Sequence, residues 1–182
     1  MRKFVTKKEK HVDMVKKIFY SLSHEEIIWR FADIFNHMED EPKNDLQTLN
    51  VGIATIFNHV QIKNCYFKKE GAPKDQTFQS IAAQLAKAVD IDSDVYRSVD
   101  LDPKFEFNGK KFGAAVGSRD MLTVAITGFA TFDQNELVSW WFLKIVARRL
   151  WEFNYCFLDM RFNNRIENNP LILREMLRLQ EG

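Results

Sequence analysis

The stretch LNVGIATIFNHVQIKNCYFKK, residues 49–69, decides the fold because it predicts a β-hairpin to which the other elements are added. Two runs of strand length, both rich in β-branched and aromatic residues, stand on either side of Asn58 and His59. These two residues can occupy the central positions of a tight turn. The stretch therefore predicts two antiparallel strands joined directly by this turn.

The segments after this hairpin predict a helix, a second hairpin and a further strand. Apolar residues recur at the spacing of an amphipathic helix at Phe78, Ile81, Ala82, Leu85 and Val89. Asn108 and Gly109 then separate two alternating apolar runs in FEFNGKKFGAAVG, residues 105–117. Asn-Gly is the strongest short hairpin signal, because both central residues of a type I′ turn need positive φ. The run MLTVAITGF, residues 121–129, predicts one more strand.

Two helices are expected before the hairpin and one short helix at the end of the chain. The first two stripes of apolar residues are Val12, Val15, Ile18, Phe19 and Leu22, then Ile27, Phe31, Ile34, Phe35 and Met38. Ser23 with Glu26 fits a capping box, in which both side chains satisfy free N–H groups of the first turn. PLILREMLRL after Asn169 predicts the closing helix, with Pro170 tolerated in its first turn. FNYCFLDMRF, residues 153–162, fits either a strand or a continuation of the preceding helix.

These elements predict an α+β fold, an antiparallel sheet of about five strands packed by helices, in a single domain spanning residues 1–182. Over roughly residues 25–152 the order of helices and hairpins resembles the general plan of GAF, PAS and profilin-like sensor domains. The resemblance implies a fold and assigns no functional residue. The remaining segments are a basic flexible N-terminus (1–10), an acidic loop (90–103) and a C-terminal tail that carries the short helix (163–182).

The stretch NELVSWWFLKIVARRLW, residues 135–151, predicts a helix that is apolar on two sides and starts at a second capping box, Asp133 with Glu136. One broad face should lie on the sheet and contains Leu137, Val138, Trp141, Phe142, Ile145 and Val146. The opposite side carries Trp140, Leu143, Ala147 and Trp151. Either the chain's own helices and tail or another protein covers this second side. Tryptophan and arginine are favoured at interface hot spots, so these four residues are interface candidates for a homo-oligomer or a protein partner.

Charge and cysteine content set the expected surroundings of the protein. The 26 basic and 25 acidic residues leave a net charge of +1, which provides no long-range attraction to nucleic acid or to an anionic membrane. Cys65 and Cys156 are too few and too far apart for a disulfide framework. Free thiols, together with the absence of a signal peptide or an uninterrupted membrane span, predict a cytoplasmic protein.

The sequence contains no recognisable catalytic, nucleotide-binding or metal-binding motif. Asp90, Asp92 and Asp94 have the spacing of the first ligands of a calcium loop, but Val95 stands in place of the glycine and Leu101 in place of the glutamate. None of the four histidines has the spacing of a zinc site. We therefore expect neither a metal nor a cofactor.

One turn combines groups that could bind an anion or another ligand at the end of the sheet. Ser118, Arg119 and Asp120 offer a hydroxyl, a guanidinium and a carboxylate in sequence, and His59 lies in the first hairpin turn. All four are also ordinary turn residues, which is the favoured explanation.

The function that follows is a non-catalytic cytoplasmic binding or regulatory domain that acts through an oligomer or partner interface and a small-molecule pocket between sheet and helices. Two alternatives stay open. The first is an enzyme with a dispersed site built from Ser118, Arg119, Asp120, His59 and the acidic loop. The second is a phage or mobile-element protein that inhibits or sequesters a host component, which the small size and the richness in lysine, asparagine and phenylalanine suggest.

Overall fold

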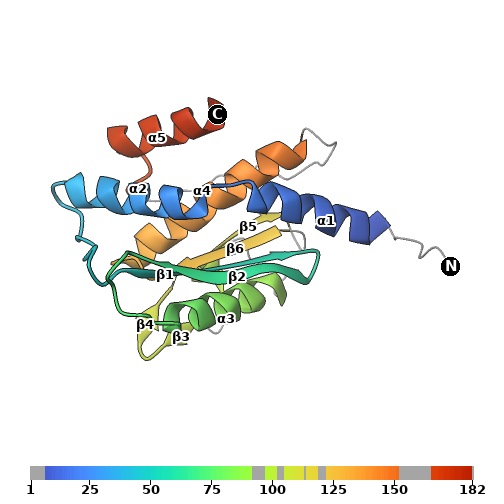
Figure 1. Ribbon diagram of the computed structural model, residues 1–182, viewed down its shortest axis with the longest axis horizontal. Coiled ribbons are helices and arrows are strands. Elements are labelled where there is room, and N and C mark those ends of the chain that lie inside the picture. Colours follow the sequence, from blue (N-terminus) through green and yellow to red (C-terminus); the bar gives the residue numbers. More distant parts are fainter. Residues whose placement is uncertain are drawn as a thin grey trace.

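The protein consists of three layers, with an antiparallel sheet between two layers of helices (Figure 1). The computed structural model describes residues 7–91, 97–101, 105–112, 114–118, 122–151 and 165–181. Helix α3 (Thr77–Ile91) covers one face of the sheet. The other face is covered by α1 (Lys7–Tyr20), α2 (His24–His37) and α4 (Phe132–Trp151), and α5 (Pro170–Glu181) lies outside α2. A 3-10 turn spans Ser98–Asp100.

The main sheet has the strand order β2-β1-β6-β5 in the described part of the chain, and all neighbours are antiparallel. Its strands are β1 (Asn50–Phe57), β2 (Val60–Lys68), β5 (Ala114–Ser118) and β6 (Leu122–Thr127). The short strands β3 (Glu106–Phe107) and β4 (Lys110–Lys111) pair with each other in a separate ribbon. The predicted α+β class and antiparallel sheet are confirmed. The sheet has four described strands rather than about five, because the second predicted hairpin is this small ribbon.

Both predicted hairpin turns are confirmed by their backbone angles. Asn58 and His59 have φ of 51° and 65°, and they join β1 to β2 without a further residue. Asn108 and Gly109 have φ of 50° and 76° between β3 and β4. Two consecutive residues with positive φ match the right-handed twist of the strands they connect.

Helix α3 approaches the sheet closely enough that a side chain is excluded at one position of β1. A Cβ atom at Gly52 would lie 2.2 Å from the carbonyl oxygen of Phe78, at the start of α3. The same carbonyl accepts a hydrogen bond of 2.7 Å from Thr127 Oγ1 of β6. The first turn of α3 is therefore fixed on the two central strands.

Helix α4 is buried on both sides by the chain itself. Trp140 and Leu143 are only 5% and 2% exposed, and α1, α2 and α5 all contact α4 on the side away from β5 and β6. Trp141, predicted to face the sheet, meets Phe31 of α2 edge to face with ring centroids 5.2 Å apart. The side chains of Ala147 and Trp151 lie outside the described residues. The second side of α4 is therefore covered by the chain itself at Trp140 and Leu143, rather than left exposed for another protein.

Neither capping box predicted from the sequence forms. The Ser23 side chain makes no capping hydrogen bond, and the first turn of α2 is closed by Ile27 N–H donating to the Ser23 carbonyl. Helix α4 starts one residue before Asp133, where Thr131 Oγ1 accepts a hydrogen bond of 3.2 Å from Gln134 N. The hydroxyl that caps α4 is therefore that of Thr131.

The two acidic residues assigned to the second capping box instead bind distant arginines. Asp133 accepts a hydrogen bond of 2.6 Å from Arg165, and Glu136 accepts bonds from Arg97 Nε and Nη2 at 2.9 and 2.5 Å. Charge-assisted bonds to a guanidinium are stronger than bonds to a backbone amide. Long-range pairing therefore replaces the local cap.

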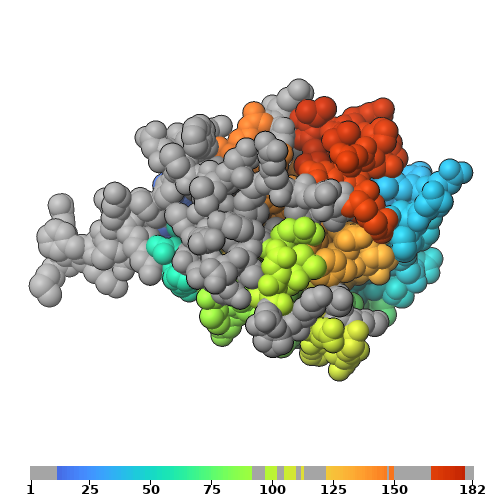
Figure 2. All heavy atoms as spheres, turned by 180° about the vertical axis from the view of Figure 1, so that it is seen from behind, coloured from blue at the N-terminus to red at the C-terminus, as the bar shows by residue number. Residues whose placement is uncertain are grey.

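The predicted C-terminal helix is confirmed as α5, which packs beside α2 (Figure 2). Two of its own residues, Ile172 and Met176, are buried. Glu175 is also buried, and it receives Arg30 of α2 at 2.8 Å and Arg178 at 2.7 Å. The segment 153–162, predicted as strand or helix, lies outside the described residues.

Candidate functional site

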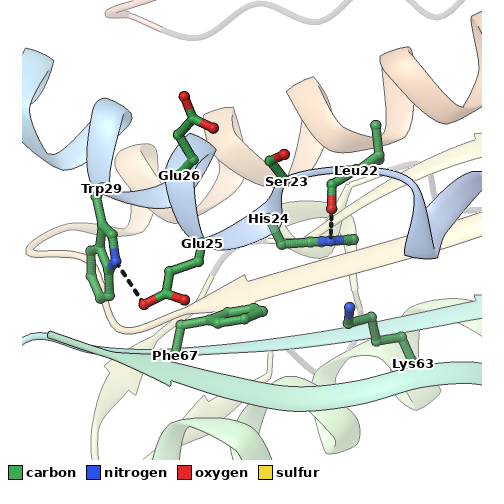
Figure 3. A pocket seen from close by; sticks show the side chains of 8 residues that line it. All are labelled: Leu22, Ser23, His24, Glu25, Glu26, Trp29, Lys63 and Phe67. Atoms are coloured by element: carbon green, nitrogen blue, oxygen red, sulfur yellow. Dashed lines mark hydrogen bonds between the residues drawn. The ribbon is translucent and has the colours of Figure 1, made fainter. Parts of the chain in front are cut away.

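Two adjoining hollows lie between the α1–α2 turn and strand β2 (Figure 3). The inner hollow has a volume of about 510 Å³ and the outer one about 430 Å³. The inner one is lined by Leu22, Ser23, His24, Glu25, Glu26, Trp29, Lys63 and Phe67. The outer one is lined by Tyr20, Gln61, Ile62, Lys63, Asn64, Cys65 and Phe67. Because Lys63 and Phe67 belong to both, the hollows form one open depression, called here the β2 groove.

The β2 groove follows an edge of the sheet. In the described sheet β2 is paired only with β1, so its other side has no strand beside it. Lys63, Cys65 and Phe67 are alternate residues, and side chains two residues apart on a strand share one face. That face is the one covered by α1 and α2, since Cys65 and Phe67 pack against the core on this side. The helices therefore form one wall of the groove and the edge strand forms the other.

His24, the first residue of α2, is the most deeply placed polar group of the groove. Its side chain is 4% exposed, and Nδ1 lies 2.9 Å from the carbonyl oxygen of Leu22. A carbonyl can only accept, so this contact assigns the ring proton to Nδ1. Nε2 then carries a bare lone pair, and within the described part of the chain it has no hydrogen-bond partner.

The His24 ring lies among aromatic rings that keep it neutral. It is stacked on Phe142 with centroids 5.2 Å apart and on Phe67 with centroids 6.3 Å apart, and Phe19 is tilted against it at 5.1 Å. Burial and, as the second cause, repulsion from the Lys63 ammonium lower the pKa of His24 to about 4, against the opposing effect of the hydrogen bond to the Leu22 carbonyl. At neutral pH the histidine is therefore an uncharged hydrogen-bond acceptor.

Lys63 lies over the groove and is held by aromatic faces. Its Nζ is 5.1 Å from the centre of the Tyr20 ring and 5.8 Å from that of Phe67, both within the range of a cation–π contact. In Figure 3 its ammonium points toward the His24 ring. Tyr20 is 65% exposed, and the face of its ring is one of the two over which the Lys63 ammonium lies.

The far end of the inner hollow is formed by Trp29 and Glu25. Trp29 Nε1 donates a hydrogen bond of 3.2 Å to Glu25 Oε1, and Lys69 Nζ lies 5.4 Å from the Trp29 ring. The groove thus combines aromatic walls with lysine and glutamate at its mouth. Cys65 adds a thiol whose pKa is raised by burial, so it is protonated at neutral pH and is a poor nucleophile.

Of the residues proposed from the sequence as an anion site, His59 and the backbone of Ser118 are described, and they lie away from the groove, at one end of the sheet. His59 Nδ1 is 3.0 Å from Asp90 Oδ2, and Asp90 is a buried residue of the last turn of α3 rather than part of a solvated loop. Ser118 ends β5, and its side chain lies outside the described residues, as do Arg119 and Asp120. The register pairs Ser118 with Leu122 and Leu122 with Phe57, which places Ser118 and the His59 turn at the same sheet end.

Glu136 is a buried carboxylate that lies away from the groove. This carboxylate is fully buried, and Arg97 binds its Oε1 while Oε2 has no partner among the described residues. Burial raises the pKa of Glu136 to about 6, against the opposing effect of Arg97. The nearby carboxylates of Asp133 and Asp100 also raise this pKa, and the value of about 6 includes their effect.

His24, Lys63 and Phe67 were not selected as site residues from the sequence. One signal was present, since Lys63 interrupts the apolar face of a strand otherwise formed by Cys65 and Phe67. A lysine at such a position marks an edge strand or a pocket. The contribution of His24 could not be read from its neighbours in the chain, because its ring partners come from α1, β2 and α4.

The described residues contain no cluster of three metal-ligating side chains and no helix long and apolar enough to cross a membrane. The geometry of the groove is therefore the basis on which a function is proposed. Comparison of the chain with protein-family models, with curated proteins and with solved structures finds no match.

Proposed function

We propose that this protein is a non-catalytic binding or regulatory domain whose binding site is the β2 groove, and that the groove receives an extended segment of a partner protein. The observation that carries the proposal is the coincidence of an unpaired strand edge with a hollow along it. The outer hollow is lined by five consecutive residues of β2 and by Phe67. Addition of a strand to an exposed sheet edge is a common way of recognising extended peptides.

The groove supports this mode because it offers both parts of such a site. The backbone of β2 can supply main-chain hydrogen bonds, which are largely independent of sequence. Alternate side chains of the added strand would then point toward α1 and α2, where Tyr20, Trp29 and Phe67 provide apolar contact. Pockets for alternate side chains give such sites their specificity.

Lys63 has a second explanation, since lysines on edge strands commonly prevent sheets from joining edge to edge. In this chain the Lys63 side chain lies on the rings of Tyr20 and Phe67 instead of extending freely into solvent. It covers the groove and can be displaced by a ring that makes the same contacts. The position of Lys63 thus supports a groove that this side chain partly covers until an entering ring displaces it.

Binding is favoured over catalysis by the chemistry of the groove. Its thiol is protonated, its histidine is neutral with a pKa of about 4, and general bases that work at neutral pH have pKa values near 7. The Trp140 and Leu143 face is less favoured as an interface, because both side chains are buried in the single chain.

The proposal is tested by selecting extended peptides from a displayed library and mapping their binding by amide hydrogen exchange. Bound peptides should slow the exchange of alternate amides between Gln61 and Phe67, and N-methylation of alternate peptide amides should abolish binding. Phe67→Ala should weaken binding at least about tenfold, as for the loss of an interface anchor. Tyr66→Ala is the matched control, because the neighbouring aromatic residue points to the other face of the same strand.

Slow exchange of the β2 amides that appears only at high protein concentration, and without peptide, would show that two copies of β2 pair with each other. The groove would then bind a second copy of this chain instead of a segment of a partner protein. Peptides that bind without changing exchange in β2 would refute the proposal.

A further inference from the structure

The unusual feature of the β2 groove is a hydrogen-bond acceptor buried among aromatic rings. His24 Nε2 is inaccessible to solvent and has no partner among the described residues, although the histidine is stacked on Phe142 and Phe67. A buried acceptor without a donor destabilises a folded chain. A phenylalanine would stack on the same rings without this cost. Compared with phenylalanine, the histidine adds the bond that Nδ1 donates to the Leu22 carbonyl and, at Nε2, the capacity to accept one further hydrogen bond.

The surroundings of Nε2 restrict the donor that can use it. Lys63 already holds a positive charge over the groove, and in Figure 3 its ammonium points toward the His24 ring, so a second cation would be repelled. A deprotonated group such as a carboxylate has no proton to donate. A neutral N–H or O–H group is left, and the walls formed by Phe67 and Trp29 favour one that belongs to an aromatic ring.

Lys63 is also suited to admit such a ring. At the groove, the described contacts of its ammonium are with the faces of Tyr20 and Phe67, whose ring centres lie 5.1 and 5.8 Å from Nζ. The flexible four-carbon chain of a lysine can change rotamer. An entering aromatic ring can take the place of Lys63 on Phe67 and offer its own face to the displaced ammonium. The movement needed to reach Nε2 is therefore a change of side-chain rotamer.

We infer that the inner hollow of the β2 groove receives an aromatic side chain that carries a hydrogen-bond donor, an indole or a phenol of the partner segment, and that this donor bonds to Nε2 of His24. The inference rests on the proposed function, since the ring is carried by the segment added to β2. His24 is then the residue that distinguishes tryptophan or tyrosine from phenylalanine at one position of that segment.

The experiment compares two probes of similar shape, indole and benzothiophene, of which only indole has an N–H. Binding is followed by long-range ¹⁵N NMR of the histidine rings, which reports Nε2 directly. Indole should bind about tenfold more tightly than benzothiophene, as for one hydrogen bond to a buried acceptor, and it should move the His24 Nε2 signal. In His24→Phe the two probes should bind equally.

His37 provides the internal control in the same spectra. It lies in the same helix, and its Nδ1 contacts the Asp33 carbonyl at 2.7 Å as His24 contacts Leu22, but it is exposed and outside the groove. Its signals should not move with either probe. Equal affinity of the two probes for the wild-type protein, or an unchanged His24 signal on indole binding, would overturn the inference even if His24→Phe does not fold.

Selected peptides separate this inference from the proposed function. Peptides that contain tryptophan should lose about tenfold in affinity when naphthylalanine, a bicyclic ring without N–H, replaces it. If peptides protect the β2 amides with no preference for a donor ring, the inference fails and the proposed function stands. If indole binds at His24 but no peptide protects β2, the occupant is a free aromatic molecule, and both the partner segment and its ring are ruled out.

Discussion

The rings of His24 and Phe142 lie face to face, with centroids 5.2 Å apart and planes inclined by 11°. This pair joins the start of α2 to the middle of α4, so it links the wall of the β2 groove to the helix at the centre of the upper layer. Its energy depends on the histidine being neutral, because an imidazolium in the same place would lose its hydration.

Acidification should therefore weaken the fold through His24. Its pKa is about 4 in the folded chain and 6.5 in the unfolded chain, so the unfolded chain binds a proton first as pH falls. Stability contributed by the neutral ring is present above pH 6.5 and is lost between pH 6.5 and 4, by roughly 3 kcal/mol. Urea unfolding across this range should show a smaller loss for His24→Phe than for wild type. His37→Phe, the exposed control, should keep the wild-type loss.

Glu136 should make the fold less stable as pH rises, which is the opposite of the effect of His24. Its pKa of about 6 lies above the ordinary 4.5, so the folded chain binds the proton more readily. The associated stability is present below pH 4.5 and is lost as pH rises through 6, by roughly 2 kcal/mol. Glu136→Gln should remove this part of the pH dependence, measured as the difference from wild type in urea unfolding. The same slope in both proteins would show that Glu136 does not titrate there, and exposed Glu39→Gln serves as control.

Gly52→Ala should destabilise the protein strongly. The new Cβ would lie 2.2 Å from the Phe78 carbonyl, which is backbone and cannot move without shifting α3. We expect a loss of about 3 kcal/mol or more in the free energy of unfolding, measured by thermal or urea denaturation. Gly71→Ala is the control, since a Cβ there meets nothing within 4 Å and only the positive φ of 86° opposes it. A larger effect at Gly71 than at Gly52 would contradict the close packing of α3.

Gln134, in the first turn of α4, is expected to be a sensitive polar residue because its side chain binds the loop before β1. Its buried amide donates to Glu41 and to the Pro42 carbonyl at 2.9 Å each, and it accepts from Asn44 at 2.9 Å. Gln134→Ala removes the bonds to the Pro42 carbonyl and the Asn44 amide, while Glu41 keeps Arg165 as its partner. The change should cost roughly 2–4 kcal/mol in the free energy of unfolding. Gln84→Ala, which removes one exposed bond to Ser80, should change it by less than about 0.5 kcal/mol.

The hairpin turns were predictable because their cause is local. Two adjacent residues that tolerate positive φ specify the turn whatever surrounds it, as Asn58 with His59 and Asn108 with Gly109 show. The helix caps failed for the opposite reason, since Glu136 finds a better partner in Arg97, which lies in another part of the chain. The residues near Glu136 in the sequence do not indicate that it will bind Arg97.

The groove was not predictable for a related reason. His24 acquires its properties from Phe19, Phe67 and Phe142, which come from three different elements. The sequence did predict that α4 has two apolar sides. Which elements cover the second side depends on the packing of α1, α2 and α5, and amphipathic spacing does not specify that packing.

The strand order also determines when the chain can complete its sheet during synthesis. Strands β1 and β2 form a local hairpin, but the inner side of β1 is paired by β6, which follows only after α3 and the β3–β4 ribbon. Until β6 leaves the ribosome, the hairpin has two open edges and its apolar β1 has no cover from α4. Long-range pairings of this kind form slowly and expose the nascent chain to aggregation. The β2 edge stays open in the described sheet and is the edge that the proposed partner segment uses, whereas the β1 edge depends on the later half of the chain.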